Sequence, residues 1–338
     1  MSAQSVNEVL QRILAIAATA PESPETGGVA VPPAAHKPKA PAASHAQKKS
    51  PAQKEIVRES NQIVMPYWSG GMAGIPNDLL RSSLFNVRGP HVPRANLINH
   101  LVAGYEKSVE IRYTGQELRQ SPDLDVFLHI LNLAQNAKPD TWISFRRSDM
   151  LRALGWNTSS KDYSRLLDCL TRLNATSLRI HSPRIDRIAE QFLPETSDQW
   201  GRGIAFSLVS AFRYEESPGK AGSVWSVKLD KELLALFKGS YYSLLALELR
   251  AKLSPFGKWL HGYLSTHRQP WPFTLSMCIE KSGSTQSLEA RNGRVLWARK
   301  VLLPALEQLK SEGFLTDFKY DIKSEKVAVS RSALFPST

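Results

Sequence analysis

The same ordered series of apolar positions occurs twice in the chain, and this internal repeat constrains the fold more than any other feature. Phe127-Leu128-His129 opens one copy, and Trp259-Leu260-His261 opens the other. Two further blocks follow in the same order and keep their spacing: Phe145, Ser148, Met150, Leu151 and Gly155 match Phe273, Ser276, Cys278, Ile279 and Gly283, and Leu166, Leu167, Leu170 and Leu173 match Leu302, Leu303, Leu306 and Leu309. Two copies with so long a period indicate duplicated domains rather than a solenoid.

Each copy predicts a helix, a short strand, a helix, a turn, a helix and a strand. The leucines of the last helix recur at i, i+1, i+4 and i+7, which gives that helix one core-facing stripe. A strand start is expected at Leu178 and at Phe314, leading into a wing. In the first copy, extended segments at 206–214 and 223–229 flank a loop that contains the turn formers Pro218 and Gly219. A helix-turn-helix followed by a β-hairpin wing is the winged-helix arrangement.

We therefore predict an α+β fold with two tandem winged-helix domains, residues 61–235 and 236–335, preceded by a disordered N-terminal tail at 1–60. Residues 6–19 of the tail have the spacing of a short amphipathic helix. Residues 20–55 are rich in Pro, Ala, Lys and Ser and have almost no large apolar side chains, so they are expected to form a disordered linker.

Charge indicates the class of partner. The chain has 43 Lys and Arg against 31 Asp and Glu, a net charge of +12, and a pI near 9.7, which favours a polyanion and nucleic acid first. No apolar run approaches the roughly 20 residues of a membrane span, and the N-terminus does not resemble a signal peptide. The only cysteines, Cys169 and Cys278, lie in apolar patterns typical of buried thiols in a reducing compartment. We expect a cytoplasmic protein without membrane contact.

The sequence offers little for catalysis. There is no GxxxxGK[ST] phosphate-binding loop, and GGMAG at 70–74 lacks the lysine. His129 and His261 lie within apolar helical patterns, where a core position is more common than a ligand role. Tyr241-Tyr242 has no HxH motif in its company, so a tyrosine nucleophile that nicks DNA has little support. We expect no enzyme, no catalytic or metal-binding residues and no cofactor.

The polar face opposite the leucines is the surface that a recognition helix presents to DNA. Helix-turn-helix modules insert the N-terminal half of this helix into the major groove. In the first copy a cap at Ser159 or Ser160 precedes the candidates for DNA contact: Lys161, Ser164 and Arg165 for bases, then Tyr163, then Arg172 for a phosphate, with Lys220 at the wing tip. The alternative is a solvated face with internal pairs such as Arg165 with Asp168.

The second copy carries a denser basic cluster at its helix start. The candidates there are Arg291, Asn292, Arg294 and Lys300, with Arg299 as a phosphate contact or a stem tucked toward the core. Arginine is suited to bidentate contact with guanine and asparagine to contact with adenine. Pro304 in mid-helix is expected to bend the helix axis. A merely solvated face is again the alternative.

Four ordered blocks resemble the TrfA family of plasmid replication initiators over about residues 62–335. They are IPNDLLRSSLF (75–85), VEIRYTGQELRQSPDLDVFLHIL (109–131), DMLRALGWNTSSKDYSRLLDCLTRLNATSLRI (149–180) and KLSPFGKWLHGYLSTHRQPWPFTL (252–275). The resemblance implies two winged-helix domains that bind direct repeats (iterons) in a plasmid origin. It also implies melting of an AT-rich segment, recruitment of the host initiator, helicase and sliding clamp, and a monomer–dimer balance. The C-terminal recognition helix is implied to do most of the base contact.

One departure from the family concerns a QLxLF-like peptide that binds the sliding clamp. Here the region is NQIVMPYW, which keeps Gln62 and has Met65 near the position of the missing Leu-Phe end. RSSLF and RSALF supply Leu-Phe without the Gln. Gln62 and Met65 are therefore candidates for partner binding.

Several functions fit a basic winged-helix chain. A transcriptional regulator, even one that represses its own gene, has the same fold, and fold does not separate it from an initiator. A nickase requires catalysis, and a scaffold with an incidental basic surface requires no sequence preference. For an initiator, melting needs additional binding energy, from cooperativity or from single-stranded DNA captured by the basic surface.

Overall fold

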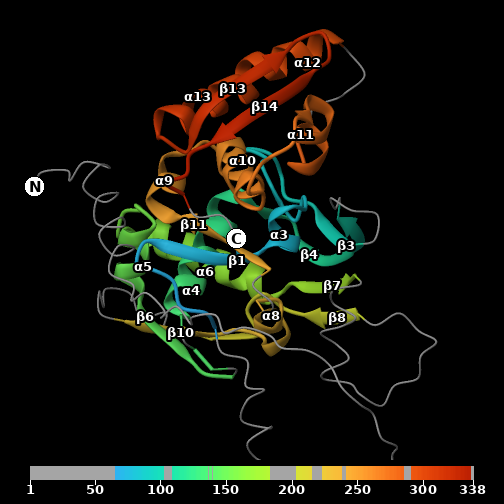
Figure 1. Ribbon diagram of the computed structural model, residues 1–338. Coiled ribbons are helices and arrows are strands. Elements are labelled where there is room, and N and C mark those ends of the chain that lie inside the picture. The colour runs from blue at the N-terminus through green and yellow to red at the C-terminus, as the bar shows by residue number, and fades with distance from the viewer. Residues whose placement is uncertain are drawn as a thin grey trace, which may run out of the picture. The chain divides into compact units, whose positions relative to one another are not determined.

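The structure is a computed structural model, and it describes residues 65–102, 109–135, 137–138, 140–182, 203–214, 223–237, 241–284 and 291–335 (Figure 1). We call residues 65–237 the first half and residues 241–335 the second half. These residues form a mixed α and β structure with two hydrophobic cores, one from Met65 to Leu245 and one from Leu249 to Val327. The tail predictions for 6–19 and 20–55 lie outside the described residues.

Each half contains the same series of elements. In the first half these are α4 (Asp125–Leu133), β6 (Ile143–Arg146), α5 (Arg147–Ala153), α6 (Ser160–Asn174), β9 (Ala211–Arg213) and β10 (Val224–Lys228). In the second half they are α10 (Pro255–Ser265), β12 (Phe273–Thr274), α11 (Leu275–Lys281), α12 (Arg291–Trp297), η3 (Ala298–Leu302), α13 (Leu303–Ser311), β13 (Leu315–Asp321) and β14 (Lys326–Arg331). The strands form antiparallel sheets in the orders β6-β10-β9 and β12-β14-β13, so the strand order is also repeated.

The turn between the paired helices is the same in both halves. Gly155 and Gly283 have φ of +69° and +65°, a backbone conformation that glycine adopts without steric strain. The next residue in each case, Trp156 or Ser284, donates its backbone N–H to the carbonyl five positions earlier. This is the usual glycine-based end of an α-helix. The matching glycines of the sequence repeat therefore stop α5 and α11 in the same way.

The leucine rows also match. Leu166, Leu170 and Leu173 are buried, as are Leu302, Leu306 and Leu309, and in each row the second leucine is half-buried. Their burial confirms the predicted core-facing stripe. A π-helical turn, η3, lies just before Pro304, which falls in the first turn of α13. A proline lacks an N–H and crowds the carbonyl four residues before it, so the wider turn of η3 accommodates Pro304 within the helix.

The predicted strand at Leu178 exists, but it does not lead directly into the wing, because it belongs to a different sheet. It is β7 (Ser177–His181), in a separate antiparallel sheet with β3 (Asn96–Val102), β4 (Glu110–Gln116) and β8 (Gly203–Phe206), in the order β3-β4-β7-β8. The strand predicted at 206–214 is divided, because β8 ends at Phe206 and β9 begins at Ala211. Leu178 and Ile180 alternate with exposed residues, a pattern that fixes a strand but not its sheet.

An antiparallel ribbon joins the two halves. β1 (Met72–Pro76) pairs with β11 (Tyr242–Ala246) along its whole length, from Met72 opposite Ala246 to Pro76 opposite Tyr242 (Figure 1). Each strand runs directly into a short helix, α3 (Asn77–Leu80) or α9 (Leu247–Lys252). The remaining elements are β2 (Phe85–Asn86), β5 (Leu118–Arg119), the distorted turn η1 (Gln120–Leu124) and α8 (Lys231–Ala235).

A buried ion cluster also joins the halves. Asp125, at the start of α4, accepts hydrogen bonds from Arg250 Nε at 2.9 Å and from Lys258 Nζ at 2.6 Å. Arg250 also donates to Gln120, through Nη2 to its backbone carbonyl at 3.0 Å and to Oε1 at 2.8 Å. Burial alone would raise the pKa of Asp125, but the two cations hold that pKa below its ordinary value. Asp125 therefore stays ionised inside the protein, where it is the counter-charge of Arg250 and Lys258.

Removal of the Asp125 carboxylate is expected to destabilise the fold strongly. Asp125→Ala leaves Arg250 and Lys258 as buried cations without their counter-charge, a change that typically lowers the free energy of unfolding by about 3–5 kcal/mol. Urea denaturation measures it. Asp149→Ala is the matched control, because its partner Arg152 and Asp149 itself are 70% and 53% exposed and such pairs contribute about 0–1 kcal/mol. Equal losses in the two variants would contradict the role of the cluster.

His261 is expected to make the fold sensitive to acid. Burial, with smaller contributions from Arg250 and Arg331, lowers its pKa from 6.5 to about 3. Below about pH 6.5 the unfolded chain binds a proton at this residue that the folded chain does not bind, so stability falls as the pH drops toward 3, by up to about 1.4 kcal/mol per pH unit. His261→Phe should show a shallower loss of unfolding free energy between pH 6.5 and 4.5. Identical slopes in wild type and variant would contradict the assignment.

Candidate nucleic-acid interface

Helix α6 presents a polar face to solvent. Ser159 caps it, because its Oγ accepts the backbone N–H of Asp162 at 3.2 Å. Lys161, Ser164 and Arg165 are exposed on the side opposite the buried leucines, and Asp168 and Thr171 continue the same face. Three of the predicted base contacts in the first half therefore lie together on an accessible surface.

Arg165 lies at the edge of this face. Its guanidinium stacks on the ring of Trp156, with 3.9 Å between the guanidinium carbon and the ring centroid. Both residues line a hollow of about 190 Å³ that also includes Asp125, Arg250 and Lys258. Three cations face one carboxylate there, so the hollow has an excess of positive charge beside the recognition face.

Two of the predicted contacts in the first half are engaged elsewhere. Tyr163 is half-buried under Arg147, whose guanidinium carbon is 4.3 Å from the ring centroid. The phosphate contact predicted for Arg172 was wrong. Arg172 Nε donates at 2.9 Å to Asp123, a fully buried carboxylate in η1 that Arg94 also contacts at 2.7 Å. Burial alone would lower the pKa of Arg172, but Asp123 raises it. Arg172 therefore neutralises the protein's own interior charge.

The corresponding helix of the second half starts earlier. When the leucine rows are aligned, Ser160, the first residue of α6, corresponds to Leu296, five residues after the start of α12 at Arg291. Arg294 lies in this N-terminal extension, and its Nε donates to Glu325 Oε1 at 2.9 Å. Arg299 and Lys300 are exposed, so Arg299 does not have a stem tucked into the core. The side chains of Arg291 and Asn292 lie outside the described residues, as do Lys220 and Gln62.

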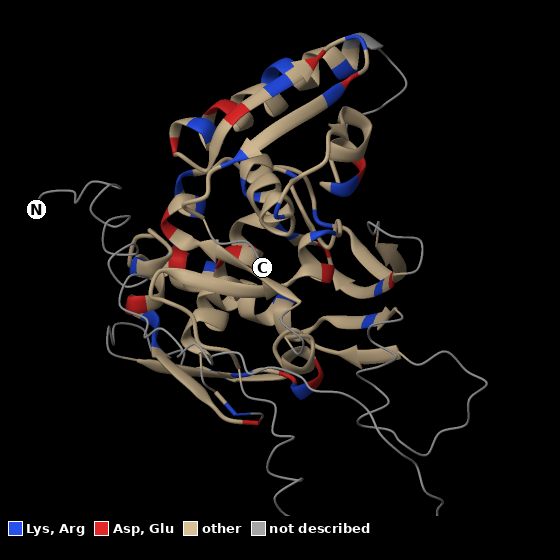
Figure 2. Ribbon diagram, viewed as in Figure 1, with Lys and Arg blue, Asp and Glu red and all other residues tan. Residues whose placement is uncertain are grey.

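The hairpin of the second half adds cations that sequence patterns missed. Lys319 on β13, Lys323 in the turn and Lys326 on β14 are exposed, as is Ile322 beside Lys323 in the chain. Figure 2 shows Lys and Arg positions along this part of the ribbon. The segment KYDIKSEK carries a lysine at about every third or fourth position. That pattern does not distinguish a hairpin from a solvated helix. The register of β13 with β14 places these cations around the hairpin turn, and the hydrogen bond from Arg294 to Glu325 joins that turn to α12.

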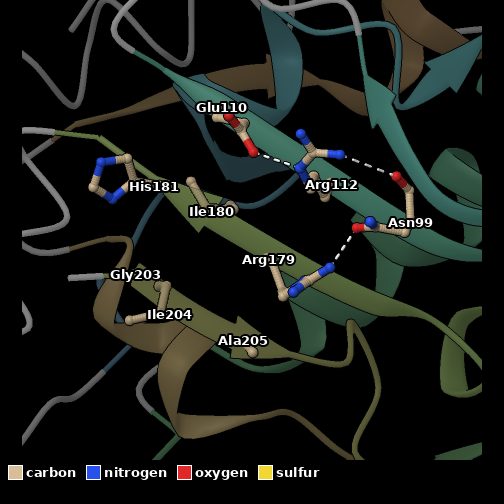
Figure 3. A pocket seen from close by; sticks show the side chains of 9 residues that line it. All are labelled: Asn99, Glu110, Arg112, Arg179, Ile180, His181, Gly203, Ile204 and Ala205. Carbon is tan, nitrogen blue, oxygen red and sulfur yellow. Dashed lines mark hydrogen bonds and ion pairs between the residues drawn. The ribbon is translucent and has the colours of Figure 1, made fainter. Parts of the chain in front are cut away.

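A second basic hollow lies on the exposed face of the β3-β4-β7-β8 sheet. Arg112 and Arg179 stand opposite each other on neighbouring strands, and Figure 3 shows their side chains converging on Asn99. Glu110 pairs with Arg112 at the rim. The hollow measures about 400 Å³ and is also lined by His181 and Gly203. Its residues come from strands far apart in the sequence, so composition alone gave no signal for it.

The clamp-binding prediction for Met65 was wrong. Met65 is 1% exposed and lies in the first core, and its backbone N–H donates to Ala137 at 3.1 Å. Leu84 and Phe85 of RSSLF are buried as well, whereas Leu334 of RSALF is exposed. A peptide that docks on a partner must be accessible, so Met65 cannot serve in this fold.

Within the described ranges, no group of three or more His, Cys, Asp and Glu residues is placed to hold a metal ion. His261 is buried in the second core, with its ring edge-to-face against Phe314 at 4.7 Å. Cys169 and Cys278 are buried free thiols, and burial raises the pKa of both. Among the helices that the structure describes, none has the length and apolar character needed to cross a bilayer.

The chain matches known proteins in sequence and in structure. The family model described as TrfA protein matches residues 41–317. The plasmid replication initiator protein TrfA of Escherichia coli is 32% identical over 248 residues, which cover 73% of this chain and 59% of that protein. The chain thus spans only about three fifths of the length of this relative.

Among solved structures, domains 2 and 3 of RctB align over 73% of this chain and 94% of theirs, with a TM-score of 0.46 and 14% identity. The Pi initiator protein in complex with iteron DNA aligns over 62% of this chain and 90% of its own, with a TM-score of 0.44 and 14% identity. From the extent of the family match and the identity to its curated relative, this chain belongs to the TrfA protein family.

Proposed function

We propose that this protein is a plasmid replication initiator that binds the direct repeats of an origin through two winged-helix domains, residues 61–235 and 236–335. One observation carries the proposal. In each half, a helix that follows a glycine turn buries a row of leucines and leaves a polar face with exposed cations outside. That geometry suits insertion into a major groove. The named activity of the Escherichia coli relative supports it.

In this mechanism the protein binds without chemistry of its own. Lysines and arginines neutralise phosphates, and each such contact lowers the log–log slope of affinity against salt by about 0.9. Lys161, Ser164 and Arg165 of the first half, and Arg291, Asn292, Arg294 and Lys300 of the second, contact base edges, while Arg299 contacts a phosphate. The two domains lie on successive major-groove faces about 10 base pairs apart.

Opening of the origin needs free energy beyond duplex binding. We assign it to cooperative binding along the repeats and to capture of single-stranded DNA on basic surface. Host partners (initiator, helicase and sliding clamp) and a monomer–dimer balance complete the proposal, with Gln62 as a remaining candidate for clamp contact. The protein acts in the bacterial cytoplasm, on the plasmid.

Loss of the Arg165 side chain tests the recognition face of the first half. Footprinting on the DNA that flanks the gene first identifies the cognate repeat. Arg165→Ala should then weaken binding to that repeat by about 1–3 kcal/mol if it contacts a base, with a smaller effect on unrelated DNA. Arg152→Ala, an exposed cation on α5 outside this face, is the matched control. Equal weakening on all sequences would reduce Arg165 to a phosphate contact.

A replication assay separates an initiator from a regulator. A plasmid that carries the repeats and no other origin should replicate in a host that supplies this protein. A transcriptional regulator would protect the repeats in a footprint and yet fail to support replication. Nicked product after incubation of supercoiled origin DNA with protein and Mg²⁺ would instead indicate an enzyme.

A further inference from the structure

An ion pair ties the recognition helix of the second half to the turn of its hairpin. Arg294 lies in α12, and Glu325 lies in the turn between β13 and β14, 31 positions later in the chain. Arg294 Nε donates to Glu325 Oε1 at 2.9 Å, and the two side chains are 25% and 23% exposed. The contact is therefore at the surface, yet partly shielded from water.

The backbone of Glu325 is held in place by its neighbours. Glu325 has φ of +51°, a conformation that few residues other than glycine adopt. Its carbonyl accepts the backbone N–H of Leu275, the first residue of α11, at 2.9 Å. Thr274, just before α11, is paired with Lys326, just after Glu325. The turn that carries Glu325 is thereby attached to the helix pair that presents Arg294.

Other titratable and charged residues lie close to the ion pair of Arg294 and Glu325. Tyr320 of β13 lies close enough to both residues that burial first, and then the Glu325 charge, raises its pKa while Arg294 opposes the rise. The exposed cations Lys323 and Lys326 flank Glu325 in the chain. A carboxylate in such a basic surface repels phosphate and lowers affinity for every DNA sequence. A structural role that offsets this cost is the orientation of a neighbouring side chain by the Glu325 carboxylate.

We propose that Glu325 is a positioning residue, which orients the guanidinium of Arg294 toward a base edge and so increases discrimination between sequences while lowering affinity for all of them. The inference rests on the proposed function. An arginine side chain has several rotatable bonds, and bidentate contact with guanine requires its planar fork in one orientation. The bond to Glu325 uses the Nε donor next to the stem, which fixes the plane of the fork.

The experiment compares Glu325→Ala with Asp321→Asn. Asp321 lies in the same hairpin, is fully exposed and accepts the backbone N–H of Lys323 at 2.9 Å, which asparagine can also do. Both variants remove one negative charge from the surface, so both should bind unrelated DNA more tightly by a similar factor. Only Glu325→Ala, which removes the acceptor of the Arg294 Nε hydrogen bond, should lower the ratio of cognate to unrelated affinity, by about fivefold or more. Fluorescence anisotropy across a salt series measures these affinities.

A third and a fourth variant test whether Glu325 acts through Arg294. Arg294→Ala and the double variant Arg294→Ala/Glu325→Ala should lose the same discrimination, because Glu325 has nothing to orient once Arg294 is gone. Thermal melting confirms that each variant is folded. If Glu325→Ala keeps the discrimination of Asp321→Asn, or if the double variant loses the product of the two single effects, the inference is overturned. Absence of sequence preference in the wild type would instead overturn the proposed function.

Discussion

The architecture depends on the burial of one row of leucines in each half. Leu166, Leu170 and Leu173 in α6 and their counterparts Leu302, Leu306 and Leu309 are all fully buried. Burial of a leucine side chain contributes about 1.5–3 kcal/mol, so a row of three fixes the rotation of its helix far more firmly than any surface contact. Once that rotation is set, the opposite face has to point outward. The exposed cations of both helices follow from this constraint rather than from any local preference of their own.

Periodicity predicted the parts of the structure that are local. The helices, the glycine turns at Gly155 and Gly283 and the leucine rows follow from spacing within about 30 residues. Sequence patterns could not supply long-range pairings. β7 has the alternation of a strand, but its partners β4 and β8 decide that it belongs to a sheet of its own. Among the site residues, the exposure of Lys161, Ser164 and Arg165 was predictable, whereas the pairing of Arg172 with Asp123 and of Arg294 with Glu325 required tertiary structure.

Formal charge overstates how much of this protein is available to a polyanion. Of the cations counted in the net charge of +12, Arg172, Arg250 and Lys258 are engaged with the buried or nearly buried carboxylates Asp123 and Asp125. They stabilise the interior and the junction between the halves. Exposed cations lie on the polar faces of α6 and of the α12–η3 helix, on the hairpin of the second half and in the hollow of the β3-β4-β7-β8 sheet. The position of each cation therefore matters more for contact with a polyanion than the net charge of the chain.

Because β1 and β11 pair with each other, each half of the chain depends on the other for the partner of one of its strands. Every residue of β11, the strand that leads into the second half, has its partner in β1, the first strand that the structure describes. A cut between the halves would leave β1 on one fragment and β11 on the other, each with unpaired backbone amides and carbonyls, the kind of exposed edge at which proteins aggregate. Although the sequence contains two copies of the repeat, the two copies are therefore not structurally independent of each other. The two copies share the β1–β11 ribbon, which forms only when both halves are present.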